Sequence, residues 1–248
     1  MLKKERQAYI IQQINIHNKV LSSDLCGQLE VSEDTVRRDL QELHEEGVLT
    51  KVHGGALSKS FHFTLQKNNI YQHPAKKIIA QKAAALIQDG MFVVLSGGTT
   101  IIELVKALPE SLNATFITVS VPTALELLNH PNCEVIFVGN KLSKTAQIAV
   151  GGEVVQKLSE IKADLCFLGT NSIDVEKGIT DIEWDVIEVK RAMMNAARKN
   201  ISLAISEKLN TEQRLQICPL QMIDTLITEL RPTDEQLQPY SKAGIKVL

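Results

Sequence analysis

Five consecutive small or hydroxylated residues, Ser96-Gly97-Gly98-Thr99-Thr100, follow an apolar segment at 92–95 and precede a helical pattern that begins near Ile101. Glycines let the backbone approach an anion closely, and the first N–H groups of a helix donate to its oxygens together with neighbouring hydroxyls. The run has neither the Gly-Lys-Ser/Thr of a P-loop nor the Gly-x-Gly-x-x-Gly of a dinucleotide fold. It is therefore a candidate phosphate site, with a plain connection between a strand and a helix as the alternative.

Further candidates lie at the ends of other predicted strands. Ser120 follows the apolar segment 115–119, and Gly151-Gly152 opens a helical stretch. Lys190 and Lys208 could supply the cations that a phosphate needs, whereas ordinary surface charge is the alternative for both. Because the carboxyl ends of parallel strands meet at one edge of a sheet, we expect these groups in one crevice. The predicted ligand-binding residues are Ser96, Gly97, Gly98, Thr99, Thr100, Ser120, Gly151, Gly152, Lys190 and Lys208.

The elements that would position these groups alternate regularly from Ala75 onward. Apolar strand-like segments are predicted at 92–95, 115–119, 135–138, 163–168, 201–205 and 225–228. Helices are predicted at 75–87, 101–107, 122–128 and 183–197. Near-continuous apolar strands separated by helices are typical of a mostly parallel sheet that is covered on both faces.

The first part of the chain has a different pattern, that of a short helical domain. A helix is predicted over 3–16, followed by a turn at Asn18-Lys19 and a short helix that Ser22 or Ser23 could cap. Ser32 is placed to cap a third helix, whose buried stripe would be Val36, Leu40 and Leu43. A support helix followed by two short helices with a tight turn between them is the layout of a helix-turn-helix.

The buried stripe leaves polar side chains of the third helix facing outward, where they could reach base edges and phosphates in a major groove. A small hairpin after Gly47 would form a wing. The alternative for Arg37 and Arg38 is a solvated helix face that pairs with Asp34, Asp39 or Glu42. The predicted DNA-binding residues are Ser32, Thr35, Arg37, Arg38, Gln41, Lys51 and His53.

Charge and composition limit the classes of protein. The chain has 27 basic and 29 acidic residues and a formal net charge of -2, so any DNA-binding surface must come from local clustering. Useful affinity would need two half-sites, and we expect a homo-oligomer, either dimer or tetramer. The scattered cysteines and histidines predict no disulfide, metal or cofactor. No run of 18 apolar residues and no signal peptide is found, which predicts a cytoplasmic protein without a membrane partner.

The segment from Val31 to Leu40, with Gly47-Val48-Leu49 and the run Val52–Ala56, closely resembles the DNA-binding signature of the DeoR family of bacterial regulators. The resemblance continues through residues 187–193 and 204–208. It implies a winged helix-turn-helix followed by a domain similar to ribose-5-phosphate isomerase and glucosamine-6-phosphate deaminase. It also implies a transcriptional regulator, usually a repressor, with an operator in double-stranded DNA and a phosphorylated sugar or related metabolite as its effector.

Three departures from the family pattern concern the predicted effector site. The loop begins with Ser96 where the family has Asp, Val119 stands where the family has Asn, and residues 205–208 read Ile-Ser-Glu-Lys in place of Asp-Ser-Ser-Lys. Polar groups that would contact sugar hydroxyls are thus replaced, while the glycines and threonines remain. The sequence therefore predicts an anion site for an unusual sugar.

The predicted domains are a winged helix-turn-helix at 1–57, a linker at 58–74 and an α/β effector domain at 75–248, in a two-domain α+β chain. One alternative is a sugar-phosphate isomerase or deaminase with an appended DNA-binding domain. Its base would be a carboxylate such as Asp174, Asp181, Glu183 or Asp185, but none of the four stands in a pattern that demands catalysis. Another alternative is a second domain that only oligomerises. We predict a regulator that is not an enzyme.

Overall fold

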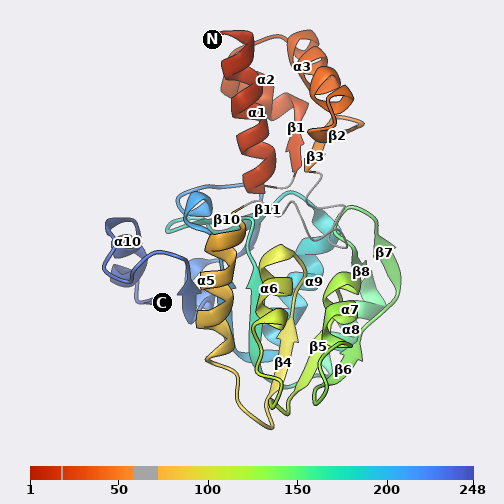
Figure 1. The fold of residues 1–248 in the computed structure, drawn as a ribbon, viewed down its shortest axis with the longest axis vertical. Helices are drawn as coiled ribbons and strands as arrows, with labels where there is room; N and C mark the ends of the chain where they lie inside the picture. The colour runs from red at the N-terminus through yellow and green to blue at the C-terminus, as the bar shows by residue number, and fades with distance from the viewer. Residues whose placement is uncertain (18, 59–71) are drawn as a thin grey trace. The chain divides into compact units, whose positions relative to one another are not determined.

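The structure is a computed structural model that describes every residue except 18 and 59–71. The chain divides into an N-terminal unit, Met1–Tyr71, and a C-terminal unit, Gln72–Leu248 (Figure 1). Most of the predicted linker at 58–74 lies outside the described residues. At its two ends, Ser58 belongs to a strand, and His73 and Pro74 begin a helix.

The N-terminal unit is a helix-turn-helix with a three-stranded antiparallel sheet of order β1-β3-β2. Its elements are α1 Lys3–His17, β1 Lys19–Leu21, α2 Ser22–Leu29, α3 Glu33–Glu45, β2 Leu49–Val52 and β3 Gly55–Ser58. The predicted stripe of Val36, Leu40 and Leu43 is buried, together with Ile10 and Leu25. The predicted hairpin is present as β2 and β3.

Two local predictions for this unit were wrong. Lys19 lies in β1 rather than in a turn, because its strand pairs with β3. Neither Ser22 nor Ser23 caps α2, since the helix begins at Ser22 itself and its N-cap is Leu21. The backbone N–H of Ser22 donates instead to the carbonyl of Gly54 at 2.8 Å, so the hairpin turn replaces a side-chain cap.

The C-terminal unit contains a seven-stranded sheet in which every neighbouring pair is parallel. From edge to edge the strands are β15 Lys246–Val247, β14 Thr225–Ile227, β12 Ala197–Leu203, β9 Ala163–Gly169, β4 Phe92–Leu95, β5 Thr115–Thr118 and β6 Glu134–Phe137. All six predicted strands belong to this sheet, with ends shifted by a few residues. The predicted fold class is confirmed.

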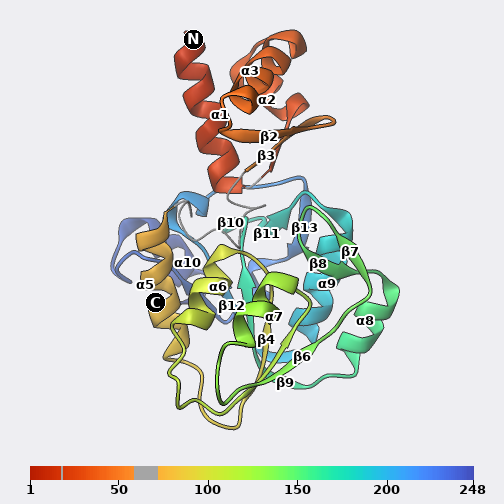
Figure 2. The ribbon, with the colours of Figure 1, turned by 45° about the vertical axis from the view of Figure 1, so that its right-hand side comes forward.

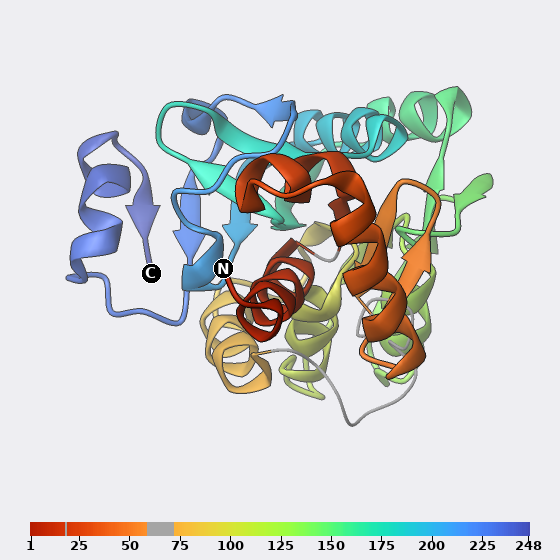
Figure 3. The ribbon, with the colours of Figure 1, turned by 90° about the horizontal axis from the view of Figure 1, so that it is seen from above.

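Helices cover both faces of this sheet. One face carries α5 His73–Ala84, α6 Thr99–Lys106 and α7 Val121–Leu127 (Figure 2), and the other carries α8 Gly152–Ser159 and α9 Trp184–Asn195 (Figure 3). A further helix, α10 Gln238–Lys242, lies near the last strand, β15. In the described part of the chain, no helix combines the length and the apolar character that crossing a membrane requires.

The order of the strands reverses at the middle of the sheet. From β4 the chain proceeds outward through β5 to β6, and it then returns to place β9 on the other side of β4. The next strands, β12, β14 and β15, continue in the opposite direction. Ligands of open parallel sheets bind outside the carboxyl ends of the strands at such a switch point. The β4 and β9 loops therefore mark the place to look for a site.

Several short strands were not predicted. A hairpin of β7 Lys141–Ser143 and β8 Ile148–Val150 precedes α8. An antiparallel sheet is formed by β10 Ser172–Asp174, β11 Gly178–Asp181 and β13 Leu215–Cys218. Segments of three or four residues are too short to show a hydrophobic period, and tertiary pairing decides them.

Candidate DNA-binding surface and effector site

The cap predicted for α3 is present. The Ser32 hydroxyl oxygen accepts from the backbone N–H of Thr35 at 3.3 Å, and the two hydroxyls lie 2.9 Å apart. The backbone at Ser32 is extended, so the chain enters the helix abruptly. Both side chains therefore begin the recognition helix, at the end that presents polar groups to a major groove.

Arg37 and Arg38 are exposed on α3, and neither makes an ion pair with any residue that the structure describes. Two of the three acids considered as their partners, Asp39 and Glu42, are engaged elsewhere. Asp39 is 1% exposed and receives the Arg6 guanidinium through two nitrogens, one of them at 3.1 Å. Glu42 accepts from Lys3 and Gln7 of α1. The outward face of α3 therefore keeps its positive charge.

The pairs between α1 and α3 were missed at the level of sequence. Hydrogen bonding to Asp39 raises the pKa of Arg6, and the hydrogen bond from Lys3 holds the pKa of Glu42 below its usual value. The available signal was position, because Asp39 lies three residues after Val36 and so on the buried side of the helix. A lone carboxylate there requires a cation from another element.

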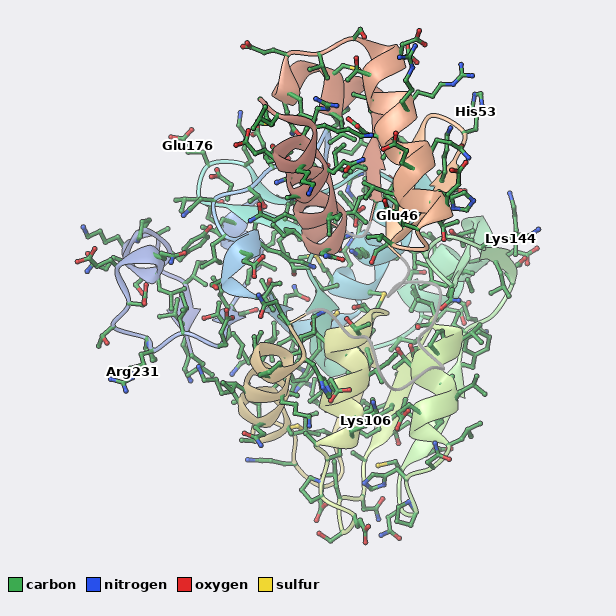
Figure 4. The ribbon with its side chains drawn as sticks, turned by 45° about the horizontal axis from the view of Figure 1, so that its top comes forward. Glu46, His53, Lys106, Lys144, Glu176 and Arg231 are labelled. Carbon is green, nitrogen blue, oxygen red and sulfur yellow. The ribbon has the colours of Figure 1, made fainter. Side chains whose placement is uncertain are left out.

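The wing contributes less free charge than expected. The Lys51 ammonium on β2 donates to the side-chain oxygen of Gln41 at 2.9 Å, and the Gln41 amide donates to Glu45 at 2.7 Å. These contacts join the wing to α3. His53 is exposed at the tip of the β2–β3 turn and projects outward (Figure 4). Of the two predicted wing residues, His53 is thus the more exposed.

The loops that follow β4 and β9 are tied together at the switch point. The Ser96 hydroxyl accepts from the backbone N–H of Gly169 at 2.7 Å, and the Ser96 carbonyl accepts from the Thr123 hydroxyl at 3.1 Å. A Cβ placed on Gly169 would lie 2.6 Å from the Gly97 carbonyl oxygen, so only glycine fits this approach. The buried Ser96 hydroxyl thus holds the site together.

The predicted glycine loop ends in a helix start of unusual backbone. Gly98 is the N-cap of α6 with φ 110°, and no side chain of the described residues caps the helix. The first N–H groups of α6 have no acceptor within the helix. Ser120 caps α7 by accepting from the Thr123 N–H, and it lies beside Gly97. The loop and Ser120 are therefore brought together as predicted.

The second glycine pair is less closely connected. Gly151 caps α8 with φ 113°, nearly the conformation of Gly98. Both Gly151 and Gly152 are exposed, and no hydrogen bond among the described residues links them to Lys190 or Lys208. The sequence pattern is the same at the starts of α6 and α8. The hydrogen bonds of the described residues connect only the α6 loop to Lys190.

Lys190 is an interior residue, so the surface alternative is wrong. It is 8% exposed, and its ammonium lies 2.9 Å from Asp181 and donates to the Gly169 carbonyl at 3.3 Å. Burial acts to raise the pKa of Asp181, but attraction to Lys190 and the hydrogen bonds outweigh it and hold the pKa below its usual value. The neighbouring Arg191 donates to backbone carbonyls and to Glu188.

Lys208 is also buried, at 9% exposure, and it is the most unusual charge in the site. Its ammonium donates to the Thr170 carbonyl at 2.8 Å and makes no ion pair with the described residues. Burial and repulsion from Lys76 and Lys190 lower the pKa of Lys208 to about 7. A buried ammonium with one hydrogen bond is ready to receive an anion.

The third lysine of the cluster, Lys76, was not predicted. It is 6% exposed in the first turn of α5, and burial lowers its pKa to about 8 against the attraction of Glu103 and Glu207. Its spacing was the available signal, because Lys76 shares the buried helix stripe with Ile79, Ala80 and Ala83. A lysine on an apolar stripe indicates a site.

The four acids considered for catalysis are not arranged as a base. Asp181 is held by Lys190 and Asn171, and Asp174 accepts from the N–H groups of its own turn. Glu183 accepts from the Thr145 hydroxyl at 2.7 Å, and Asp185 is exposed. The geometry thus supports anion binding more than enolisation.

Comparisons with known proteins address both units. The chain matches the family models for the DeoR-like helix-turn-helix domain over residues 6–61 and the DeoR C terminal sensor domain over residues 71–230. It is 31% identical to the HTH-type transcriptional regulator GolR of Listeria innocua, over 100% of this chain and 98% of GolR. It is 32% identical to the HTH-type transcriptional repressor GlcR of Bacillus subtilis, over 100% of this chain and 96% of GlcR.

Among solved structures, ribose 5-phosphate isomerase A of Methanocaldococcus jannaschii aligns over 54% of this chain and 53% of the isomerase. The identity is 18% and the TM-score is 0.40. The fold assignment therefore rests on the sheet topology of this chain.

Proposed function

The chain belongs to the DeoR family of transcriptional regulators, and we propose that it is a repressor that releases its operator when a phosphorylated sugar or related metabolite binds the C-terminal unit. Its predicted function as a DNA-binding transcriptional regulator agrees with the names of its relatives. The identity of the sugar, its site and the response of the protein to it are the proposed part.

The single observation that carries the effector proposal is the buried ammonium of Lys208. Burying a charge without a counter-charge costs several kcal/mol. Burial and two further lysines, Lys76 and Lys190, disfavour its charged form, and they outweigh the attraction of Asp181 and Glu207. Such a cluster is costly in the ligand-free protein, and a phosphate dianion would compensate it. This cost is a reason to place a ligand there.

The position of the cluster favours a phosphate group. Lys190 donates to the carbonyl of Gly169, whose N–H is bonded to Ser96 at the base of the glycine loop. Lys190 is therefore connected through Gly169 to the loop before α6, where we propose that the N–H groups and hydroxyls of Thr99 and Thr100 donate to phosphate oxygens. With Ser96 in place of an acid, fewer groups remain to accept from sugar hydroxyls.

For DNA, we propose that α3 enters the major groove and that Arg37 and Arg38 make its main contacts. Thr35, Gln41, Lys51 and His53 would add contacts to bases or phosphates. Acidic side chains outnumber basic ones in residues 1–57, so one unit alone would bind weakly. We therefore propose a homo-oligomer that places two recognition helices on two half-sites.

The experiment measures operator release by a panel of phosphorylated sugars and their unphosphorylated counterparts. The operator is selected from random duplex DNA with the full-length protein. We expect at least one phosphorylated sugar to release DNA and to raise the melting temperature, because a ligand that binds the native state stabilises it. The Thr99→Val/Thr100→Val variant should bind the operator but lose the response.

The proposal fails if every phosphorylated compound leaves both the DNA complex and the melting temperature unchanged. Turnover is measured on the same panel. Conversion of a sugar phosphate by the wild-type protein, lost in Asp181→Asn, would instead support the isomerase alternative. We expect no conversion, because Asp181 is held as an ion pair with Lys190.

A further inference from the structure

The strand at one end of the parallel sheet, β6, pairs with β5 on one side and with no other strand that the structure describes. The backbone N–H groups of Glu134 and Val138 donate to carbonyls on the β5 side, at 3.0 and 2.9 Å. Successive residues of a strand direct their backbone groups to opposite sides, so those of Val135 and Phe137 face away from β5. The outer side of β6 therefore offers two N–H groups and two carbonyls to a further strand.

The opposite end of the same sheet is better protected against pairing. Its last strand, β15, has only two residues, and the first of them is the exposed Lys246. Short strands and lysines are two of the ways in which proteins keep a free edge from joining another sheet. By contrast, β6 has four residues, and its Ile136 and Phe137 are exposed. Of the two ends, the β6 edge is thus the one that is suited to pairing.

Apolar side chains are also exposed on the elements beside β6. The helix α7 packs against β6 and exposes two leucines one turn apart (Figure 1). The hairpin strand β7 follows β6 after a short connection and exposes a third leucine. Together these residues form the edge patch, which comprises Leu125, Leu128, Ile136, Phe137 and Leu142. Exposed apolar residues on adjoining elements are typical of a protein–protein interface.

The two ends of this edge carry opposite charges. The exposed Glu134 begins β6, whereas the exposed Lys141 and Lys144 come after its carboxyl end. Lys144 projects outward (Figure 4), and neither lysine makes an ion pair with any described residue. When two copies of this edge run antiparallel, the acidic end of each lies toward the basic end of the other. The edge is therefore complementary to itself, which favours a second copy of this chain as its partner.

We propose that two copies of this chain assemble through β6, whose outer sides pair antiparallel across a two-fold axis and continue one sheet through both C-terminal units. This inference rests on the proposed homo-oligomer and assigns its interface. In antiparallel pairing, two residues that both face the other strand exchange two hydrogen bonds. Val135 of each copy would thus pair with Phe137 of the other, and the two copies of Ile136 would lie opposite each other at the axis.

This register also gives a place to the other features of the edge. Glu134 of one copy would lie opposite Val138 of the other, next to the residues that lead to Lys141. The exposed side chains of the edge patch would be removed from water, which favours association. A two-fold contact of this kind closes on itself and yields a dimer rather than an open chain of copies. A dimer supplies the two recognition helices that an operator with two half-sites requires.

The first experiment measures the mass of the full-length protein by sedimentation equilibrium. Ile136→Lys places a charge at the proposed axis. Its matched control is Ile78→Lys on α5, because Ile136 is 40% exposed and Ile78 is 42% exposed. Circular dichroism checks that both variants fold, and gel-shift titration gives their affinity for the selected operator.

The second experiment tests the register by disulfide formation under mild oxidation. In the proposed pairing, the Cα atoms of the two copies of residue 136 lie about 4.5 Å apart, within reach of a disulfide. The two copies of residue 134, which lies on the same face of the strand, would be separated by roughly 13 Å. Ile136→Cys is therefore compared with Glu134→Cys, and the wild type controls for the native cysteines.

We expect Ile136→Lys to halve the mass of the assembly and to weaken operator binding about tenfold or more, because one copy supplies a single recognition helix. Ile78→Lys should keep the mass and the affinity of the wild type. Ile136→Cys should form a covalent dimer, whereas Glu134→Cys and the wild type should not.

The contrary outcomes separate this inference from the proposed function. An unchanged mass in Ile136→Lys, or no cross-link in Ile136→Cys, would overturn the β6 interface and leave the homo-oligomer to another surface. Equal cross-linking of Glu134→Cys and Ile136→Cys would overturn the two-fold register. A wild type that is monomeric both alone and on its operator would contradict the proposed homo-oligomer, and this inference with it. Operator release by the effector is measured on the wild type, so failure of the proposed effector response is recognised separately.

Discussion

The basic side chains of the two units lie in opposite environments. Arg37 and Arg38 stand in solvent on α3, whereas Lys76, Lys190 and Lys208 are buried around the switch point of the sheet. Exposed arginines cost the folded state little and can meet a large polyanion with little rearrangement. A buried lysine without a counter-charge costs stability, and a bound anion would offset that cost. This difference is what we expect if the chain uses accessible charge for DNA and interior charge for a small ligand.

The largest expected effect is a loss of stability when Lys190, which pairs with the buried Asp181, is removed. Lys190→Ala should lower the free energy of unfolding by about 3–5 kcal/mol, because it leaves Asp181 charged and buried without its partner. The sequence predicts Lys190 only as a cation for a bound phosphate, whereas its ion pair with Asp181 gives it a structural role as well. Urea unfolding measures the change, with the exposed Lys177→Ala as a control.

The double variant Lys190→Met/Asp181→Leu should recover most of the lost stability, since it removes both charges. If Lys190→Ala were as stable as Lys177→Ala, the Asp181–Lys190 pair would not hold the interior of the site. Lys190 would then contribute no more to stability than an exposed lysine does.

Loss of the exposed arginines of α3 should reduce DNA affinity and leave stability unchanged. Arg37→Ala and Arg38→Ala should each weaken operator binding by about 1–3 kcal/mol if the side chain makes a bidentate base contact. Stability should not change, because neither arginine makes an ion pair within the described residues. Gel-shift titrations give the affinities, and Arg198→Ala in the other unit is the matched control. Wild-type affinity in both variants would exclude α3 as the reading helix.

The sequence predicts part of the DNA-binding surface on α3 but not the contacts between α1 and α3. The cap by Ser32 and the stripe of Val36, Leu40 and Leu43 follow from local spacing, and both are present. The Arg6–Asp39 pair joins residues 33 positions apart and could be recognised only from the structure. In the same way, the central strands were predicted from their apolar runs, whereas the environment of Lys76 and Lys208 depends on tertiary packing.

The two glycine-capped helix starts offer a matched comparison within one unit. Gly98 and Gly151 share a positive φ and have open space where a Cβ would lie, so alanine at either position should cost about 1–3 kcal/mol of backbone strain. We expect Gly98→Ala to lose the response to the phosphorylated effector and Gly151→Ala to keep it. The reason is that only the Gly98 loop is linked through Gly169 to the lysines, among the contacts of the described residues.

Thermal shift with the effector measures this difference, and circular dichroism checks that both variants fold. Equal loss in the two variants would mean that α8 also binds the ligand. Loss in Gly151→Ala alone would move the anion to α8 and separate it from the lysine cluster.

The most gradual effect concerns pH. Lys208 titrates near 10.5 when unfolded and at about 7 when buried, so the unfolded chain retains a proton that the folded chain releases in this window. Unfolding free energy should therefore rise with pH between about 7 and 10.5, by at most about 1.4 kcal/mol per pH unit from this group. Sulfate, as a test anion, should bind more weakly as pH rises above 7. Urea unfolding over this range measures the first trend, and Lys208→Met should reduce both.

The most direct test measures the melting temperature of the wild type and of Lys208→Met with and without inorganic phosphate. Below pH 7 and without phosphate, Lys208→Met should melt higher than the wild type, because it removes a buried charge that makes no ion pair with the described residues. Phosphate should then raise the melting temperature of the wild type but not that of the variant. If Lys208→Met melts lower without phosphate and both proteins gain equally from it, the buried lysines do not form the effector site.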